Sequence, residues 1–483
     1  MNRLSWPKCI GVVFALCMAT AMAARAQTVT TLATFTYANG ADPANQSLVQ
    51  GLDGNLYGTT LYGGAYDTCA TYGCGTVFKI SPNGTLTTLH SFDGTDGFEV
   101  YGGLVQTTDG NFYGTASAGG TSPNCGGGCG TVFKITPGGT FTTLYSFAGS
   151  DGSGPTGPLV QARDGNFRGM TTSGGAYCAP YGCGTIFKIT PLGALTTLYS
   201  FSGPDGSYPY NGLVEGADGN FYGETTLGGA YGTGTIFKIT PWGALTTLFS
   251  FYGADGGLPT GGLIQATNGN LYGTTETGGT SPNCVGGCGT VFTITTGGSL
   301  TTLWNFDSTD GFIPFSGVIE GTDGNFYGTT VEGGDDYLCP GGCGTIFEIT
   351  PGGTLTTVYS FLNFSDGSEP QRLAQDTDGN FYGTGADGGY DGTGIVFSLA
   401  MGLGPFVKSL PHSGTVGASI KILGTELTGT TSVSFEGTAA VFTVDSDTEI
   451  STIVPEDATT GRIRVGTPGG VLLSSGPFLV IRE

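Results

Sequence analysis

The chain has 483 residues, of which 92 are Gly and 23 are Pro, and only 11% are charged. An ordinary globular chain has about 25% charged residues. A disordered chain combines high charge with few aromatic residues, whereas 11% of this chain is aromatic. The net charge of −22 argues against nucleic acids and anionic membrane surfaces as partners, because both require clustered Lys and Arg. The composition therefore predicts a folded protein rich in turns.

Residues 1–26 have the features of a secretory signal peptide. Arg3 and Lys8 precede a short apolar run, residues 9–23, which small residues follow. The run is too short to span a bilayer comfortably, although an uncleaved anchor is the alternative. No later stretch is long and apolar enough, so we expect no transmembrane segment after signal removal. The sequence thus predicts a secreted, periplasmic or cell-surface protein.

Residues 27–402 repeat three phrases. Asp-Gly-Asn followed by an aromatic residue or Leu begins at Asp53 and recurs at spacings of 56, 55, 54, 50, 55 and 55 residues, with Asn in place of Asp in one copy. Gly-Thr-Val/Ile-Phe-Lys-Ile follows in six copies, two of which replace the Lys, and recurs weakly at Gly394. The third phrase, Leu-Thr-Thr-Leu-Tyr-Ser-Phe, has its seventh copy displaced to the start of the mature chain, at residues 29–35. A unit of about 50 residues repeated seven times governs the fold.

Each repeat has the pattern of four short antiparallel strands. In the third copy we expect them at residues 158–162, 167–172, 184–190 and 194–201, with tight turns after the first and third. Four strands in about 50 residues are typical of a propeller blade. The displaced seventh copy supplies the strand that the last repeat lacks, which would close the ring. The sequence therefore predicts an all-β seven-bladed β-propeller, with a linear β-solenoid as the alternative.

Two phrases also carry a family resemblance: Gly-Asn-Phe-Tyr-Gly-Thr-Thr at residues 324–330 and Gly-Thr-Ile-Phe-Lys-Ile-Thr-Pro at residues 234–241. They resemble the GloVer tandem-repeat family of secreted bacterial proteins, over about 370 residues. The resemblance implies export and surface display with a variable C-terminal module. It implies no established activity.

Ten cysteines lie outside the leader, in five local pairs. An even count in an exported chain favours disulfides. Zinc is the alternative, since two pairs supply four sulfurs, but successive pairs occupy equivalent repeat positions and would point apart. The pairs occur only in the five repeats whose loop after the Gly-Gly step has eight to ten residues, and are missing from the two repeats with four. We therefore predict the disulfides Cys69–Cys74, Cys125–Cys129, Cys178–Cys183, Cys284–Cys288 and Cys339–Cys343.

Residues 403–483 leave the repeat pattern. Alternating short strands about ten residues apart predict an Ig-like β-sandwich. The segment resembles an IPT/TIG domain, which implies an accessory or contact module. The DNA-binding members of that family do not fit an exported, acidic protein.

No motif predicts a catalytic residue or a metal site. The chain has two His and lacks Gly-x-Ser-x-Gly and His-Glu-x-x-His. Calcium at the Asp-Gly-Asn turns is an open alternative, although one Asp and one Asn per turn fall short of the six to eight oxygens that calcium takes. We expect no cofactor and leave the question of enzymatic activity open.

The candidate binding face is the rim that carries the longer, varied loops, because function concentrates on loops held by a rigid scaffold. Aromatic side chains beside acidic and amide groups suit a glycan or a cell-surface protein. We expect a scaffold that binds such a ligand without catalysis. The alternatives are a carbohydrate-active enzyme that uses carboxylates in the central channel, a purely structural surface protein, and tyrosines that only pack their own loops. The candidate ligand-binding residues are Tyr66, Tyr177, Tyr231, Tyr337 and Tyr390.

Overall fold

The computed structural model describes residues 27–482 except 44–46, 70–71, 181, 335–338, 340, 363–365 and 390. The described residues form strands, turns and loops, and among them there is no helix that could cross a bilayer. The expectation of an all-β protein is therefore confirmed. Of the predicted ligand-binding residues, Tyr337 and Tyr390 lie outside the described residues.

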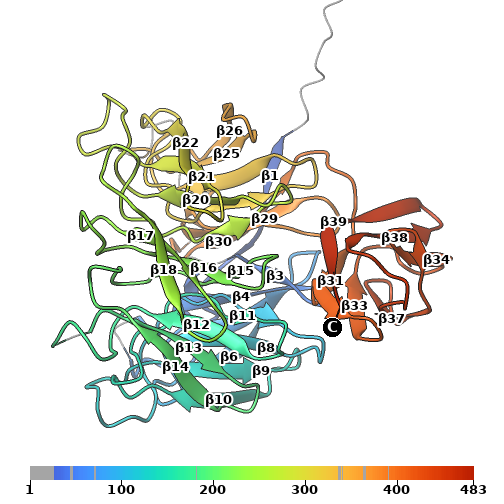
Figure 1. Cartoon of the computed structure of the whole chain (residues 1–483), viewed down its shortest axis with the longest axis horizontal. Coiled ribbons are helices and arrows are strands. Elements are labelled where there is room, and N and C mark those ends of the chain that lie inside the picture. The colour runs from blue at the N-terminus through green and yellow to red at the C-terminus, as the bar shows by residue number, and fades with distance from the viewer. Residues whose placement is uncertain are drawn as a thin grey trace, which may run out of the picture.

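Seven antiparallel sheets carry the repeats (Figure 1), and we call them repeat sheets 1 to 7. The first three contain β2 (Ala41–Pro43), β3 (Val49–Gln50), β4 (Leu56–Tyr62), β5 (Thr76–Ile80) and β6 (Leu86–Ser91); β7 (Val105–Gln106), β8 (Phe112–Ala116), β9 (Thr131–Ile135) and β10 (Phe141–Ser146); and β11 (Val160–Gln161), β12 (Phe167–Thr171), β13 (Thr185–Ile189) and β14 (Leu195–Ser200).

Repeat sheets 4 to 7 follow the same plan. They contain β15 (Val214–Glu215), β16 (Phe221–Thr225), β17 (Thr235–Ile239) and β18 (Leu245–Ser250); β19 (Ile264–Gln265), β20 (Leu271–Thr275), β21 (Thr290–Ile294) and β22 (Leu300–Asn305); β23 (Val318–Glu320), β24 (Phe326–Thr330), β25 (Thr345–Ile349) and β26 (Leu355–Ser360); and β27 (Ser368–Pro370), β28 (Ala374–Gln375), β29 (Phe381–Asp387) and β30 (Ile395–Ala400), joined by β1 (Thr28–Thr34).

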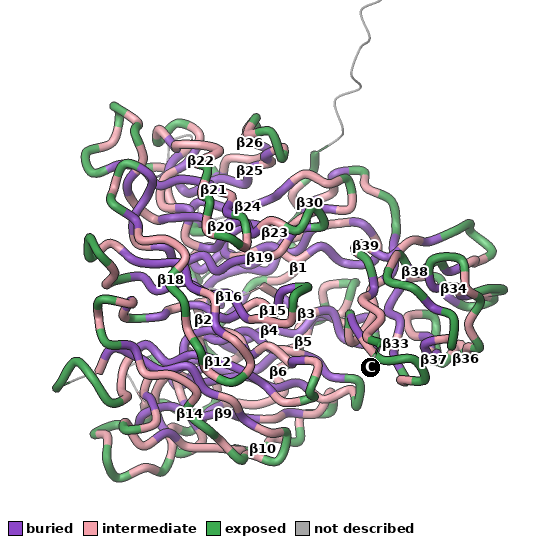
Figure 2. The backbone as a smooth tube through the Cα atoms, viewed as in Figure 1, coloured by how far each residue is buried: buried purple, intermediate pink, exposed green. Residues whose placement is uncertain are grey.

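Within each repeat sheet, the burial of the residues differs between the inner strands and the fourth strand. The second and third strands are almost fully buried, whereas the fourth is half exposed. Figure 2 shows that the buried residues lie mainly in the interior of the repeat region. The core lies between neighbouring sheets, where the Tyr57 ring of β4 packs 4.1 Å from the Phe112 ring of β8. The same contact recurs as Tyr327 of β24 on Phe381 of β29, at 4.4 Å.

The first strand of a repeat is shorter than the sequence pattern predicts. In repeat sheet 3 we expect residues 158–162, and the strand is limited to Val160–Gln161. Pro158 has no N–H to donate to a neighbouring strand. Gly157 packs so closely on the next repeat that a Cβ there would lie 2.3 Å from the carbonyl carbon of Asn211. The chain therefore enters each sheet as a loop segment pressed against its neighbour.

The two ends of the repeat region meet in repeat sheet 7. Strand β1 pairs antiparallel with β30, from Thr28 opposite Ala400 to Thr34 opposite Ile395. One buried cluster then combines Tyr382 of repeat sheet 7 with Leu56 and Phe78 of repeat sheet 1. Contacts between sheets thus continue from the seventh back to the first.

The C-terminal module is made of two further sheets. They order their strands as β31-β33-β37-β36 and β32-β39-β38-β34-β35, around a core that includes Ile420, Phe435 and Phe478. Their bounds are β31 (Lys408–Leu410), β32 (Ser413–Thr415), β33 (Ser419–Leu423), β34 (Ser432–Phe435), β35 (Thr438–Ala439), β36 (Phe442–Val444), β37 (Glu449–Ile453), β38 (Gly461–Thr467) and β39 (Gly470–Ile481).

Candidate functional site

The repeat sheets present two different rims. The short-turn rim holds the turns between strands one and two and between strands three and four of each repeat. The long-loop rim holds the connections between strands two and three and from one repeat to the next. Because the strands of each sheet are antiparallel, these two sets of connections lie at opposite ends of the sheet.

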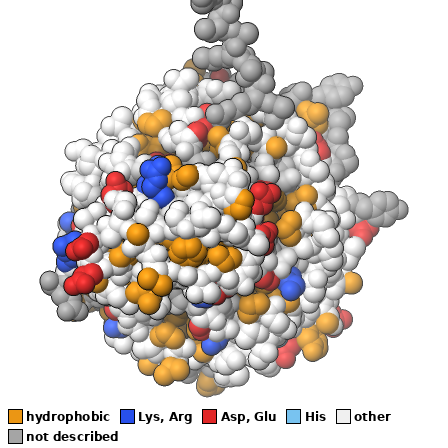
Figure 3. All heavy atoms as spheres, turned by 90° about the vertical axis from the view of Figure 1, so that its right-hand side faces the viewer, with side chains coloured by type: hydrophobic (Ala, Val, Ile, Leu, Met, Phe, Trp, Pro, Cys, Tyr) orange, Lys and Arg blue, Asp and Glu red, His pale blue; other side chains and the backbone are white. Residues whose placement is uncertain are grey.

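The C-terminal module docks on the short-turn rim. The Thr448 hydroxyl donates to the Leu52 carbonyl at 2.7 Å, and the Phe406 amide donates to the Thr377 carbonyl at 3.0 Å. The Lys408 ammonium donates to the Gln375 carbonyl. Figure 1 places the module beside the repeat sheets, and Figure 3, which looks onto that side, shows charged side chains scattered among uncharged surface. The long-loop rim is therefore the rim that the module leaves free.

The Asp-Gly-Asn turns of the short-turn rim use their own carboxylates. The Asn55 amide and the Tyr57 hydroxyl donate to Asp53, the latter at 2.7 Å, and burial with this bond raises the pKa of Tyr57. Repeat sheet 3 replaces the tyrosine by Arg168, which binds Asp164 through two nitrogens at 2.6 and 2.8 Å. Nowhere in the described part of the chain do three or more His, Cys, Asp or Glu gather as metal ligands. These turns are held by Asx geometry.

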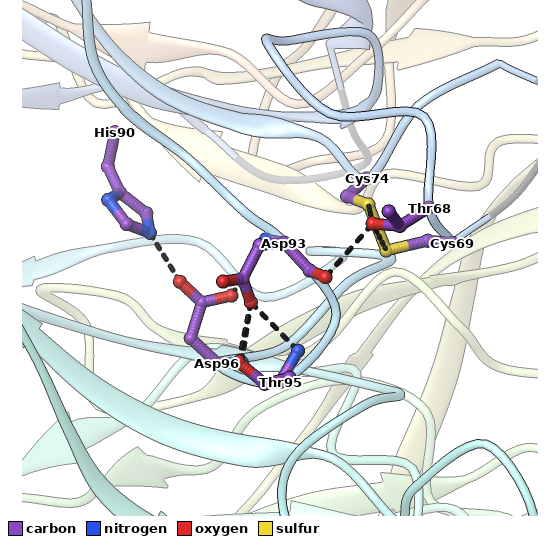
Figure 4. Close-up of a disulfide and its surroundings, with 7 residues drawn as sticks. All are labelled: Thr68, Cys69, Cys74, His90, Asp93, Thr95 and Asp96. Carbon is purple, nitrogen blue, oxygen red and sulfur yellow. Dashed lines mark hydrogen bonds and ion pairs between the residues drawn. A yellow bond between two sulfur atoms is a disulfide. The ribbon is translucent and has the colours of Figure 1, made fainter.

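A second aspartate anchors the loop that leaves the fourth strand in repeat sheets 1 to 6. Asp151 accepts from the Ala148 amide at 2.8 Å and from the Tyr145 hydroxyl at 2.5 Å. In the loop of Figure 4, His90 takes the tyrosine position and its Nε2 lies 2.7 Å from Asp96. This histidine therefore has a structural partner that explains its place in the repeat.

One copy of this anchor is incomplete. Phe249 stands where the same strand of repeat sheets 1, 2, 3, 5 and 6 has Tyr, His or Trp. The buried Asp255 Oδ2 has no hydrogen-bond partner among the described residues. Burial raises the pKa of Asp255. Phe249 meets Phe251 at 5.3 Å and 77°, and Tyr199 meets Phe201 at 5.4 Å and 77°. The rings of Phe249 and Tyr199 thus have the same placement, and they differ only in the tyrosine hydroxyl.

We predict that Phe249→Tyr raises the free energy of unfolding by about 1 kcal/mol, because the new hydroxyl donates to the Asp255 carboxylate. The reverse change in the neighbouring repeat, Tyr199→Phe, removes the bond to Asp205 and is expected to cost about 1 to 2 kcal/mol. Urea denaturation of both variants measures this. A loss of stability in Phe249→Tyr would contradict the assignment.

The cysteines lie in the long loops in the predicted combinations. The five pairs have Cα–Cα distances of 5.2 to 5.5 Å, within the range of disulfides. In Figure 4, the Cys69–Cys74 bond lies beside Thr68, whose hydroxyl donates to the Asp93 carbonyl at 3.0 Å. The bond closes the loop, and the threonine ties it to the segment that enters the next repeat.

We predict five bonds, each within its own loop, in the purified protein. Rings this short contribute only about 2 to 3 kcal/mol each in the loop-entropy model, so reduction should loosen the loops and leave the repeat sheets folded. Non-reducing peptide mapping with circular dichroism before and after reduction tests this. Ten free thiols, or a bond such as Cys74 to Cys125, would contradict the prediction.

The predicted tyrosines of the long-loop rim are exposed and separate. Tyr66, Tyr177 and Tyr231 expose 48%, 56% and 65% of their surface, and each stands in the loop of a different repeat. Tyr177 lines a hollow with residues 197–200 and 202 of its own repeat. Tyr231 meets the exposed Tyr252 at 6.0 Å. The structure thus places the three on one rim without joining them into a single site.

Sequence reasoning missed four other exposed tyrosines on this rim, Tyr37, Tyr72, Tyr208 and Tyr252. Tyr37 and Tyr72 share a pocket with Tyr66. Tyr37 follows the displaced seventh phrase, at a position that is Gly in four of the other copies. An aromatic residue in place of a repeated glycine was the signal that could have identified it.

Sequence reasoning also missed a group of acids near the segments that enter the first strands. Asp42 of β2 and Glu369 of β27 both have positive φ, 54° and 51°, and Asp387 lies near them. Burial, with the charges of Asp387 and Glu369, raises the pKa of Asp42 to about 7. Asp42 is therefore a carboxyl group able to exchange a proton near neutral pH.

The comparisons with solved structures concern the fold. A fungal alcohol oxidase of the AA5 family, solved with copper, aligns over 94% of this chain and 99% of its own, with 14% identity and a TM-score of 0.51. PorZ, a surface component of the type-IX secretion system of Porphyromonas gingivalis, aligns over 93% of this chain and 61% of its own, with 13% identity and a TM-score of 0.45. A gluconolactonase from Xanthomonas campestris aligns over 79% of this chain and 93% of its own, with 15% identity and a TM-score of 0.40. No curated protein matches the sequence.

The repeats themselves match a family model. Residues 8–179 and 126–339 match the Gloeobacter/Verrucomicrobia repeat, which together is more than half of the chain. This agrees with the phrases that define the repeat sheets and with the resemblance seen in the sequence. The chain belongs to the Gloeobacter/Verrucomicrobia repeat family.

Proposed function

We propose that the protein is an exported scaffold that binds a glycan or a protein ligand on its long-loop rim. In this proposal residues 1–26 are a signal peptide, residues 27–402 form a closed seven-bladed β-propeller, and residues 403–483 form an Ig-like domain of the IPT/TIG type. The seven repeat sheets, the pairing of β1 with β30 and the contacts of the seventh sheet with the first support the propeller. The cysteine pairs in the loops support export.

One observation carries the binding role. The C-terminal module occupies part of the short-turn rim, while the opposite rim exposes tyrosines, of which Tyr66 and Tyr177 stand in loops that hold cysteine pairs. Tyrosine offers a large apolar face and a polar tip at low conformational cost, which makes it a frequent recognition residue. A rigid scaffold with tyrosine-bearing loops is suited to binding.

The experiment is a ligand screen on the full mature chain, with glycan arrays and pull-down from cell surfaces, followed by a rim comparison. The variant Tyr66→Ala/Tyr177→Ala/Tyr231→Ala should weaken binding at least tenfold with an unchanged fold. The control Asn166→Ala/Asn220→Ala alters two short turns, where each asparagine side-chain amide donates to the aspartate two residues earlier, to the Asp164 carbonyl and to the Asp218 carboxylate. It should lower stability and leave affinity within twofold. The opposite pattern would overturn the rim assignment.

The acids around Asp42 support a second candidate function, a carbohydrate-active enzyme. A carboxyl group with a pKa near 7 beside two others is suited to general acid catalysis. Incubating the ligands found in the screen with the protein and with Asp42→Asn separates the two functions. Turnover that the variant abolishes favours the enzyme, and binding without turnover favours the scaffold.

A further inference from the structure

Repeat sheet 1 carries a pocket on the long-loop rim whose walls are tyrosines. Its volume is about 470 Å³, within the range of small-molecule sites. The Tyr37 and Tyr72 rings lie 6.0 Å apart at an angle of 22°, and Tyr62 meets Tyr72 edge-on at 6.2 Å. The lining residues are Tyr37, Gly63, Gly64, Ala65, Tyr66, Asp67, Tyr72 and Gly73.

The backbone builds this pocket on a floor without side chains. The Gly63 amide donates to the Tyr72 carbonyl at 2.7 Å, and the Gly64 amide donates to the Tyr37 carbonyl at 2.8 Å. Gly63 has a φ of +76°, and a Cβ there would lie 2.6 Å from the Tyr37 oxygen. Only glycine therefore lets the two tyrosine segments approach each other. The Cys69–Cys74 pair closes a ring that contains Tyr72.

The other repeats show that the fold does not need these rings. The amide equivalent to Gly64 donates in repeat sheets 2 to 6 to the carbonyls of Gly94, Gly149, Gly203, Gly253 and Ser308, so these residues occupy the Tyr37 position. The amide equivalent to Gly63 donates to Gly127, Gly286 and Gly341, which occupy the Tyr72 position. The same hydrogen bonds form without an aromatic side chain. The rings of Tyr37 and Tyr72 are thus additions to a loop that folds without them.

The rings are also exposed. Tyr37, Tyr66 and Tyr72 expose 51%, 48% and 58% of their surface, so three apolar faces with hydroxyl edges meet at one place in water. A pyranose ring has the complementary surface, with C–H groups on its faces and hydroxyls at its edge. Among the described residues that line the pocket, Asp67 is the one charged residue and there is no Lys or Arg, which disfavours uronic or sulfated sugars.

We propose that this pocket is a subsite for a neutral pyranose unit of a glycan. The proposal rests on the binding role of the long-loop rim and assigns its ligand class and position. Tyr66 was predicted from its place in the loop, whereas the pocket adds Tyr37 and Tyr72 as partners. The apolar face of the sugar would lie on a phenol ring, and the tyrosine hydroxyls and Asp67 would bind its hydroxyl groups.

The test is calorimetric titration of the full mature chain with hexasaccharides of glucose, xylose, mannose and N-acetylglucosamine. Tyr37→Gly/Tyr66→Ser/Tyr72→Gly gives repeat sheet 1 the residues of repeat sheet 2, namely Gly94, Ser122 and Gly127. We expect at least tenfold weaker binding with an unchanged melting temperature. Tyr66→Ser alone serves if the triple variant is unstable. Trp242→Ala, an exposed aromatic residue in a turn of the short-turn rim, is the control and should stay within twofold.

The outcomes separate the pocket from the rim. A neutral glycan whose binding falls in the pocket variants and persists in Trp242→Ala supports the subsite. Unchanged glycan binding in the pocket variants, with loss in Tyr66→Ala/Tyr177→Ala/Tyr231→Ala, overturns the subsite and leaves the rim function standing. The subsite proposal is also overturned if the protein binds only protein ligands or only acidic glycans. If the screen finds no ligand whose binding depends on a residue of the long-loop rim, both proposals are overturned.

Discussion

Removing residues 27–36 is expected to lower the melting temperature sharply and to cause aggregation. The deletion takes away strand β1, whose residues pair with β30 from Thr28 opposite Ala400 to Thr34 opposite Ile395. Strand β30 would then be an unpaired edge, and such an edge is a template for association with other chains. Thermal unfolding followed by circular dichroism and light scattering measures both effects. An unchanged melting curve would contradict the prediction that the N-terminal strand closes repeat sheet 7.

A point substitution tests the same closure without shortening the chain. Phe35 follows β1, is 1% exposed, and packs edge-on against Phe78 at 5.0 Å. We expect Phe35→Ala to cost about 3 to 5 kcal/mol, the usual range for a buried phenylalanine. Tyr37→Ala, two residues further on and half exposed, is the matched control and should change stability by less than about 0.5 kcal/mol. Similar losses for both would mean that the segment as a whole, and not the buried contact, determines stability.

The repeat made much of this fold predictable. Strand position followed from three phrases that recur at nearly constant spacing, because each unit buries the same residues against its neighbours. The first strand was the exception, expected over residues 158–162 and limited to Val160–Gln161. Its length depends on a contact with the next repeat, at Gly157 and Asn211, which the residues of one repeat cannot reveal.

The candidate site was less predictable, for a related reason. A phrase that recurs in every repeat identifies scaffold residues, whereas a binding site depends on departures from it. Tyr66, Tyr177 and Tyr231 were found because they share one loop position. Tyr37 and Tyr72 were not, because their meeting depends on two backbone hydrogen bonds to a Gly-Gly step. Tyr37 and Tyr72 occupy different positions of the repeat, and these two hydrogen bonds bring them together in the folded chain.

Glu224 is another such departure, in the interior of repeat sheet 4. Five of the other repeats have Thr at this position and the third has Met170. The hydroxyls of Thr115 and Thr329 donate to carbonyls of the following repeat, at 3.1 and 3.3 Å. Glu224 is 3% exposed, its Oε2 accepts from the Gly262 amide at 3.0 Å, and its Oε1 has no partner among the described residues. Burial raises the pKa of Glu224 to about 8, against the weaker opposing influence of that amide and of Arg372. The carboxyl group is thus held neutral inside the protein at neutral pH.

This buried acid should make the stability of the protein depend on pH. Since the folded pKa lies above the unfolded value, the folded state binds the extra proton, and its stabilisation is complete below about pH 4.5 and is lost as the pH rises to about 8. The loss amounts to on the order of 4 kcal/mol. Glu224→Gln keeps the shape and stays neutral, so we expect it to equal the wild type near pH 5 and to exceed it in free energy of unfolding near pH 8.5.

Urea denaturation between pH 5 and 8.5 measures the effect, with Glu456→Gln, an exposed position of the C-terminal module, as the control for a lost surface charge. The control should follow the wild-type profile. A Glu224→Gln protein that loses stability at pH 8.5 would show instead that the ionised carboxylate is stabilised, with Arg372 as its partner. The pH profile therefore distinguishes a buried neutral acid from a buried ion pair at the centre of the repeat sheets.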